Sequence, residues 1–135
     1  MKQFYRSTSG AGAVEFALVS PLLIAILMAI IEFSMIFYTY ASAELITADV
    51  NRQVATNHIV GSQFQSKVTP RLPAWVQEKG TATAATTPTT ESGVVFWTAT
   101  TTIPLLSAAP TSFFSALYGS RTMTVVNVMR QEPRP

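Results

Sequence analysis

Apolar residues dominate the first third of the chain. From Phe16 to Ile31 the sequence carries no charge, and Ser20 and Pro21 are the interruptions. The apolar character continues, with one acid, to Tyr40. A bilayer core is crossed by about 20 apolar residues in a helix. The pattern therefore predicts a transmembrane helix near the N-terminus, and Pro21 should kink or loosen it by removing a backbone hydrogen bond.

Two acids bracket this apolar run. Glu15 precedes it and Glu32 follows it. An ionised carboxylate near the middle of a bilayer costs about 2.5–3.5 kcal/mol on insertion scales, so each acid needs a partner or an interface. Glu32 lies roughly 25 Å along the helix from Glu15, near the far edge of the hydrocarbon core. We expect Glu32 either to pair with a neighbouring helix in an assembly or to reach the interface beside the aromatic residues around Tyr40.

Beyond residue 40 the pattern becomes that of an amphipathic helix. Ala43, Ile46, Val50 and Val54 recur at spacings of three and four, with polar residues between them. We predict that the transmembrane helix continues in this form, so that residues 11–60 are one helix. Gly61 is then expected to be its C-cap.

Residues 61–93 lack a long periodic pattern. The spacing from Ser62 to Gln65 is that of a capping box and predicts a short helix, and a last helical turn is expected at residues 73–79. Residues 81–93 are rich in Thr and Ala and contain Pro88. This tract could be an edge strand, an exposed loop or a glycosylated segment. We expect a loop, and so a linker, because nothing in it can fill a core.

Residues 94–135 show strand patterns. Residues 94–103 alternate, residues 110–119 resemble a helical turn, and residues 122–130 form a second strand candidate that is apolar on both faces. Such a strand favours a central or covered position. The predicted fold class is α+β: a long N-terminal transmembrane and amphipathic helix, followed by a small domain with a short helix and a small antiparallel sheet.

Composition restricts the function. The chain has 135 residues, 48% of them hydrophobic and 12% charged, with a net charge of +2. Lys2 and Arg6 account for that charge, and basic residues that flank a span stay cytoplasmic, which places the C-terminal part outside. The sequence contains no basic patch interleaved with aromatic residues, so nothing in it indicates nucleic-acid binding. The absence of Cys excludes disulfides, thiol nucleophiles and Cys-based zinc sites.

No catalytic, metal-binding or cofactor motif is present. His58 is the single His and lies in a polar helical stretch, where a solvated side chain is the usual case. The chain contains no phosphate-binding loop and no G-x-S-x-G motif. We therefore expect no enzymatic activity and no cofactor.

The string Gly10-Ala11-Gly12-Ala13-Val14-Glu15-Phe16 carries a family resemblance. It resembles the processing site of the type IV pilin superfamily, and its continuation through the aromatic cluster resembles TadE-like minor pilins of the tight-adherence (Flp/Tad) branch. A looser similarity extends to the ends of both predicted strands. The resemblance implies a pilin-like fold and cleavage between Gly10 and Ala11, with residues 1–10 as the leader. It also implies a prepilin peptidase, other minor and major pilins and an inner-membrane assembly platform as partners, besides membrane lipid.

Glu15 has a physical reason within this interpretation. Cleavage after Gly10 would give Ala11 a free α-amine with a reference pKa of about 7.7–8.0. Residues 11 and 15 are four apart and share a helix face, so the amine and the carboxylate can neutralise each other within a subunit or between neighbours. Processing would thus supply the counter-ion that assembly needs.

The sequence predicts a minor pilin, or pseudopilin, that supports assembly of a Flp-type pilus used in surface adhesion and biofilm formation. It would span the bacterial cytoplasmic membrane once. One alternative is an unprocessed single-pass protein with an extracytoplasmic binding domain. Another is a domain secreted after cleavage at an A-x-A site that ends at Ala43.

Overall fold

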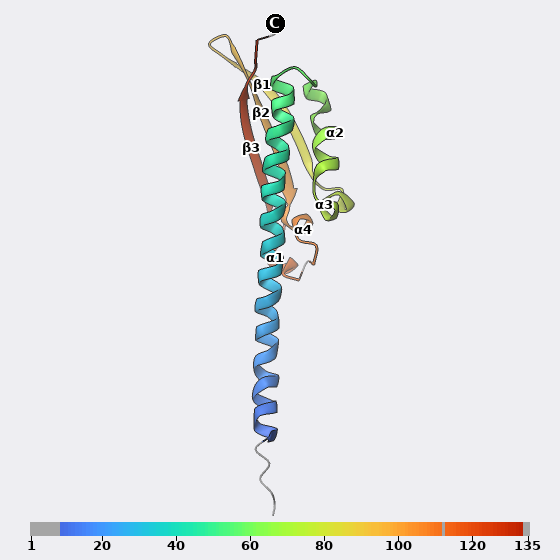
Figure 1. Cartoon of the computed structure of the whole chain (residues 1–135), viewed down its shortest axis with the longest axis vertical. Helices are drawn as coiled ribbons and strands as arrows, with labels where there is room; N and C mark the ends of the chain where they lie inside the picture. The colour runs from blue at the N-terminus through green and yellow to red at the C-terminus, as the bar shows by residue number, and fades with distance from the viewer. Residues whose placement is uncertain (1–8, 112, 134–135) are drawn as a thin grey trace, which may run out of the picture.

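A single helix forms the axis of the molecule. The computed structural model describes residues 9–111 and 113–133. Helix α1, Ser9–Ala55, is continuous through 47 residues, which corresponds to roughly 70 Å. Its N-terminal half extends alone, and its C-terminal half carries the remaining elements, which we call the head (residues 61–133) (Figure 1). The predicted α+β class is confirmed.

Asn57, rather than Gly61, ends the long helix. Asn57 adopts a left-handed φ of 60°. The amides of Asn57 and His58 donate to the carbonyls of Val54 and Gln53 at 3.0 and 2.9 Å, which is the pattern of a Schellman motif. The prediction of a helix to residue 60 with Gly61 as its cap is therefore wrong. Gly61 instead allows its backbone to lie close to Trp97, because a Cβ at this position would be 3.0 Å from the Trp97 ring.

The head contains a three-stranded antiparallel sheet in the order β1-β2-β3. Strand β1, Thr83–Glu91, pairs with β2, Val94–Pro104, and β2 pairs with β3, Thr122–Arg130. A two-residue hairpin joins β1 to β2 through Ser92 and Gly93, both with positive φ, as a tight hairpin turn requires.

Two of the sequence predictions for the strands are wrong. The expected loop at residues 81–93 is largely β1, since Thr favours extended backbone and a strand can be held by pairing without filling a core. The strand at 122–130 lies at an edge of the sheet, not at its centre. Its Val126 and Val128 are 59% and 57% exposed on the face away from the core.

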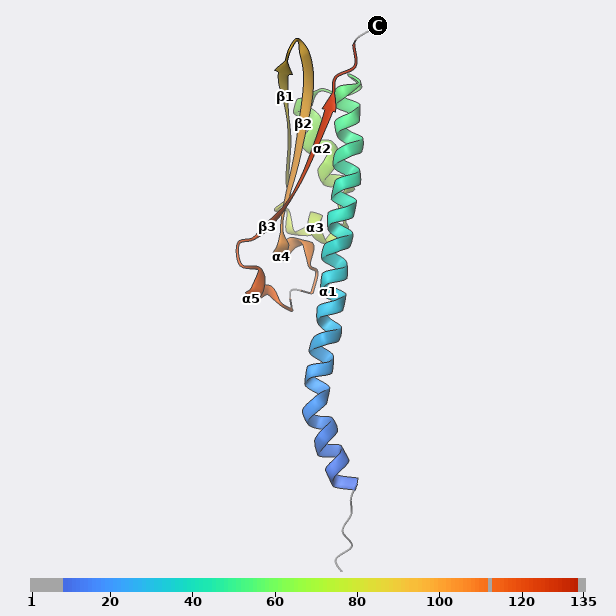
Figure 2. The same ribbon diagram turned by 90° about the vertical axis from the view of Figure 1, so that its left-hand side faces the viewer.

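Short helices complete the head and close its core. They are η1 (Gly61–Gln63), α2 (Phe64–Val68), η2 (Thr69–Arg71), α3 (Ala74–Lys79), α4 (Leu105–Ala108) and α5 (Ser115–Tyr118). Helices α1 and α2 lie on the same side of the sheet (Figures 1 and 2). The core includes Phe64 and Val68 of α2 and Val76 of α3. Val50 and Val54 of the predicted apolar stripe on α1 belong to the same core.

Candidate functional site

The N-terminal half of α1 is uncovered and apolar. A window of this helix has a mean hydropathy of 2.5, with none of it buried, so α1 is long and apolar enough to cross a membrane. Most of the large side chains from Val14 to Ile31 are exposed. Residues 10–31 extend over roughly 33 Å, close to the hydrocarbon thickness of about 30 Å. Glu32, the next residue, is buried. Contact between α1 and the head therefore begins where a membrane-spanning segment of this length would end.

The residues of the predicted processing site lie at the open start of α1. Gly10, Ala11 and Glu15 are all helical and exposed. A Cβ at Gly10 would meet no heavy atom within 4 Å. Among the described residues, no ion pair involves Glu15. Helix α1 also continues across Pro21 without interruption.

Glu32 is turned into its own chain at the junction between span and head. Its side chain is fully buried. Its Oε2 accepts a hydrogen bond from the backbone N–H of Phe114 at 3.0 Å, across 82 residues of sequence. Its Oε1 is buried without a hydrogen-bond partner among the described residues. The sequence predicted that Glu32 would pair with a neighbouring helix or reach the solvated interface. The structure instead buries Glu32 against its own chain.

Tyr118 of α5 lies in the same buried region. Burial raises the pKa of the Tyr118 hydroxyl, and the nearby negative charge of Glu32 raises it further. No hydrogen bond of ordinary geometry reaches the Tyr118 hydroxyl from any described residue. We therefore attribute the effect of Glu32 to its charge rather than to a well-formed hydrogen bond. The junction thus holds one carboxylate and one phenol, each with a buried oxygen that has no hydrogen-bond partner among the described residues.

A row of three polar residues and one alanine packs α1 against the head. Thr39, Ala43, Thr47 and Asn51 are each four residues apart and fully buried. Thr47 shares a hydrogen bond of 2.7 Å with Thr101 of β2. The hydrophobic pattern predicted the apolar residues of this face but not the Thr and Asn residues. Their four-residue spacing from Ala43 is the signal that places them on it.

Asn51 connects α1 to all three strands. Its amide Nδ2 donates to the carbonyl of Trp97 on β2 at 3.0 Å and to the side chain of Asn127 on β3 at 3.0 Å. Its Oδ1 accepts a longer hydrogen bond from Thr86 on β1 at 3.4 Å. Because donor and acceptor are both used, this buried amide fixes the rotation of α1 relative to the sheet.

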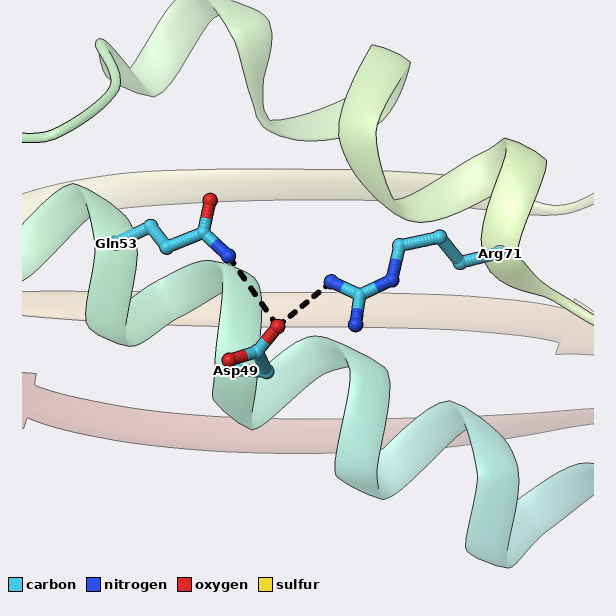
Figure 3. A network of polar contacts seen from close by, with 3 residues as sticks. All are labelled: Asp49, Gln53 and Arg71. Carbon is cyan, nitrogen blue, oxygen red and sulfur yellow. Dashed lines mark hydrogen bonds and ion pairs between the residues drawn. The ribbon is translucent and has the colours of Figure 1, made fainter.

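A second, exposed contact lies on the outer side of α1, two residues before Asn51. Arg71 forms a salt bridge of 2.7 Å with Asp49, and Gln53 donates to the same carboxylate oxygen at 3.2 Å (Figure 3). Both charged side chains are about half exposed. Such a pair contributes about 0.2–1 kcal/mol, so it supports the packing of η2 on α1 without determining it.

The described residues show no grouping typical of a metal centre or a catalytic site. No cluster of three or more metal-ligating side chains occurs among them. His58 is exposed and shares a hydrogen bond of 2.8 Å with Thr56, two residues earlier.

These features define a class of protein: a long apolar N-terminal helix, able to cross a membrane, that carries a small α+β head. The family model described as TadE-like protein matches residues 10–50 of this helix. Over these residues, which make up less than half of the chain, the protein is similar to TadE-like proteins of the Tad pilus system. The comparisons with curated proteins and with solved structures find no match.

Proposed function

We propose that the protein is a minor pilin, or pseudopilin, that supports assembly of a Flp-type pilus used in surface adhesion and biofilm formation. The observation that carries this proposal is the Gly10-to-Phe16 string at the free start of α1, inside the TadE-like match and directly ahead of an uncovered helix of membrane length. Residues 1–10 would be removed by a prepilin peptidase.

The division of α1 into an uncovered half and a docked half supports this role. In the docked half, each buried polar side chain forms at least one hydrogen bond with the head. These side chains are Glu32, Thr39, Thr47 and Asn51. In the other half, most of the large apolar side chains from residue 14 to residue 31 are exposed. That surface can face lipid before assembly and other pilin helices after it.

The proposed topology follows from the basic residues ahead of the span. Lys2 and Arg6 would hold the N-terminus in the cytoplasm, and the head would lie outside the cytoplasmic membrane. The partners would be other minor and major pilins and the inner-membrane assembly platform. Glu15, with the new amine of Ala11, would pair within the assembly.

Leader cleavage is tested by Gly10→Leu. We expect the native chain to begin at Ala11 and the variant to retain Met1, because a bulky side chain at this position would obstruct the peptidase. A Cβ at Gly10 contacts nothing in the structure, so the change tests recognition and not folding. Mass spectrometry of the N-terminus from native membranes measures the result, with Gly10→Ala as the milder control. Normal maturation of Gly10→Leu would show that the assigned cleavage site is wrong.

The role of Glu15 is tested by Glu15→Leu. We expect membrane insertion to be intact or improved, since removing a carboxylate lowers the cost of insertion, while co-isolation with partner pilins is strongly reduced. Glu44→Leu is the matched control, because Glu44 is an exposed acid on the head-bearing half of the same helix. Membrane fractionation and pull-down from cross-linked cells measure the two properties. Loss of insertion, or equal recruitment of Glu15→Leu and wild type, would contradict the pairing role.

The same N-terminal measurement separates the alternatives. An unprocessed anchor with an external binding domain would begin at Met1. Secretion after Ala43 would give Glu44 as the first residue. The structure disfavours secretion, because Ala43 is fully buried inside α1 and such a cut would remove the contacts of Glu32 and Thr39 with the head.

A further inference from the structure

The end of the head nearest the membrane-length segment exposes apolar side chains. Phe113 is 55% exposed and Leu117 of α5 is 68% exposed. On α1, Phe33 and Phe37 are also more than half exposed. A groove of about 640 Å³ lies between α1 and the chain around α5. Its lining includes Phe33, Phe37, Phe114, Leu117 and Arg121. The surface is therefore continuous from helix to head.

The hydrogen bond of Glu32 fixes the height of this surface. Because Phe114 donates to Glu32, the chain around α5 lies beside the first buried residue after the uncovered segment 10–31. Figure 2 shows α5 at the lower end of the head, on the side of the bare helix. If segment 10–31 fills the hydrocarbon core, Phe113 and Leu117 lie at its outer boundary.

The chemistry of this part of the chain suits that boundary. Residues 105–120 contain no charged side chain, and Arg121 follows them directly. Aromatic rings favour the membrane interface, and apolar faces of peripheral segments insert about 5–10 Å into the region between headgroups and acyl chains. An Arg that lines an apolar groove suits the phosphate of a lipid, with the acyl chain of the lipid along the groove.

We propose that Phe113, Phe114 and Leu117, which we call the foot, insert into the outer leaflet of the membrane and that the groove beside them holds a phospholipid. This proposal rests on α1 crossing the membrane and does not depend on leader cleavage. The foot gives the protein a second membrane contact besides α1, and this contact fixes the orientation of the head relative to the membrane. It also explains how a buried carboxylate is kept from lipid, since the chain that carries the foot covers Glu32.

The absence of Cys allows a direct test with single fluorophores. Phe113→Cys and Leu117→Cys carry the probe on the foot, and both side chains are exposed, so the core is not disturbed. Leu23→Cys is the control within the span. Val128→Cys is the matched control for an exposed apolar residue on the head, on the open face of the sheet. The full chain is reconstituted at one copy per nanodisc made of phosphatidylcholine and phosphatidylglycerol.

We expect nitroxide-labelled acyl chains to quench the probes at Phe113 and Leu117 several-fold more than the probe at Val128. Aqueous iodide should show the opposite order. Equal behaviour of the foot and Val128 probes, with Leu23 quenched by lipid, would overturn this proposal alone. An unquenched Leu23 would overturn it together with the membrane anchor. Protection of the foot that appears only with several copies per disc would also overturn it and would assign the groove to a helix of a second copy.

Discussion

Replacing Asn51 by alanine is expected to lower the free energy of unfolding of the head by about 2–4 kcal/mol. The reason is that the variant removes the donor shared by Trp97 and Asn127, and each buried polar group left without a partner costs about 1–3 kcal/mol. Reversible chemical denaturation of the full chain in detergent micelles, followed by the fluorescence of Trp75 and Trp97, measures the change.

Two further variants separate the hydrogen bonds of Asn51 from its packing and from general effects on α1. Asn51→Asp keeps the shape but loses the amide donor, so it should destabilise the head at neutral pH at least as much as Asn51→Ala. Asp49→Asn, two residues earlier, breaks a half-exposed salt bridge and should cost less than about 1 kcal/mol. If Asn51→Asp were tolerated, or if Asn51→Ala and Asp49→Asn had equal effects, the connecting role of Asn51 would be refuted.

Replacing Phe64 by alanine is expected to cost about 3–5 kcal/mol, the usual range for truncation of a buried aromatic side chain. Phe64 is 1% exposed and begins α2, where it belongs to the core formed with α1 and the sheet. The truncation leaves a cavity in this core. The same denaturation measurement applies.

Controls for Phe64 come from the same chain. Phe64→Leu keeps most of the apolar volume and should cost clearly less than Phe64→Ala. Leu45→Ala removes a side chain that is 73% exposed on α1 and should have little effect on the head. A loss for Phe64→Ala no larger than that for Leu45→Ala would mean that the packing of α2 against α1 does not hold the head together.

Together these contacts suggest how the molecule divides its tasks. The docked half of α1 packs into the core of the head, so changes at Asn51 or Phe64 should alter the stability of the head and leave the span intact. Changes at Gly10 or Glu15 should affect processing and recruitment and leave the head folded. The foot lies between the two regions, where Glu32 ties α1 to the chain beside α5.

Much of the fold could be predicted from local pattern. The strand candidates at residues 94–103 and 122–130 correspond to β2 and β3, because alternation and β-branched residues act over a few positions. The end of α1 was misplaced because Asn57, not a Gly, takes the left-handed conformation. At strand β1 a loop was favoured over the edge strand that forms, because the stability of β1 comes from pairing with β2 and Thr-rich sequence suits a loop equally well.

The sequence by itself determined the apolar, membrane-length helix, the Gly10-to-Glu15 string and the stripe that continues along α1, since helix formation and hydropathy depend on near neighbours in the chain. Only the tertiary structure decided the partner of Glu32, the three-strand contact of Asn51, the edge position of β3 and the foot beside Phe33. These depend on contacts between residues up to 82 positions apart. Such contacts follow from register and packing, which a local pattern does not specify.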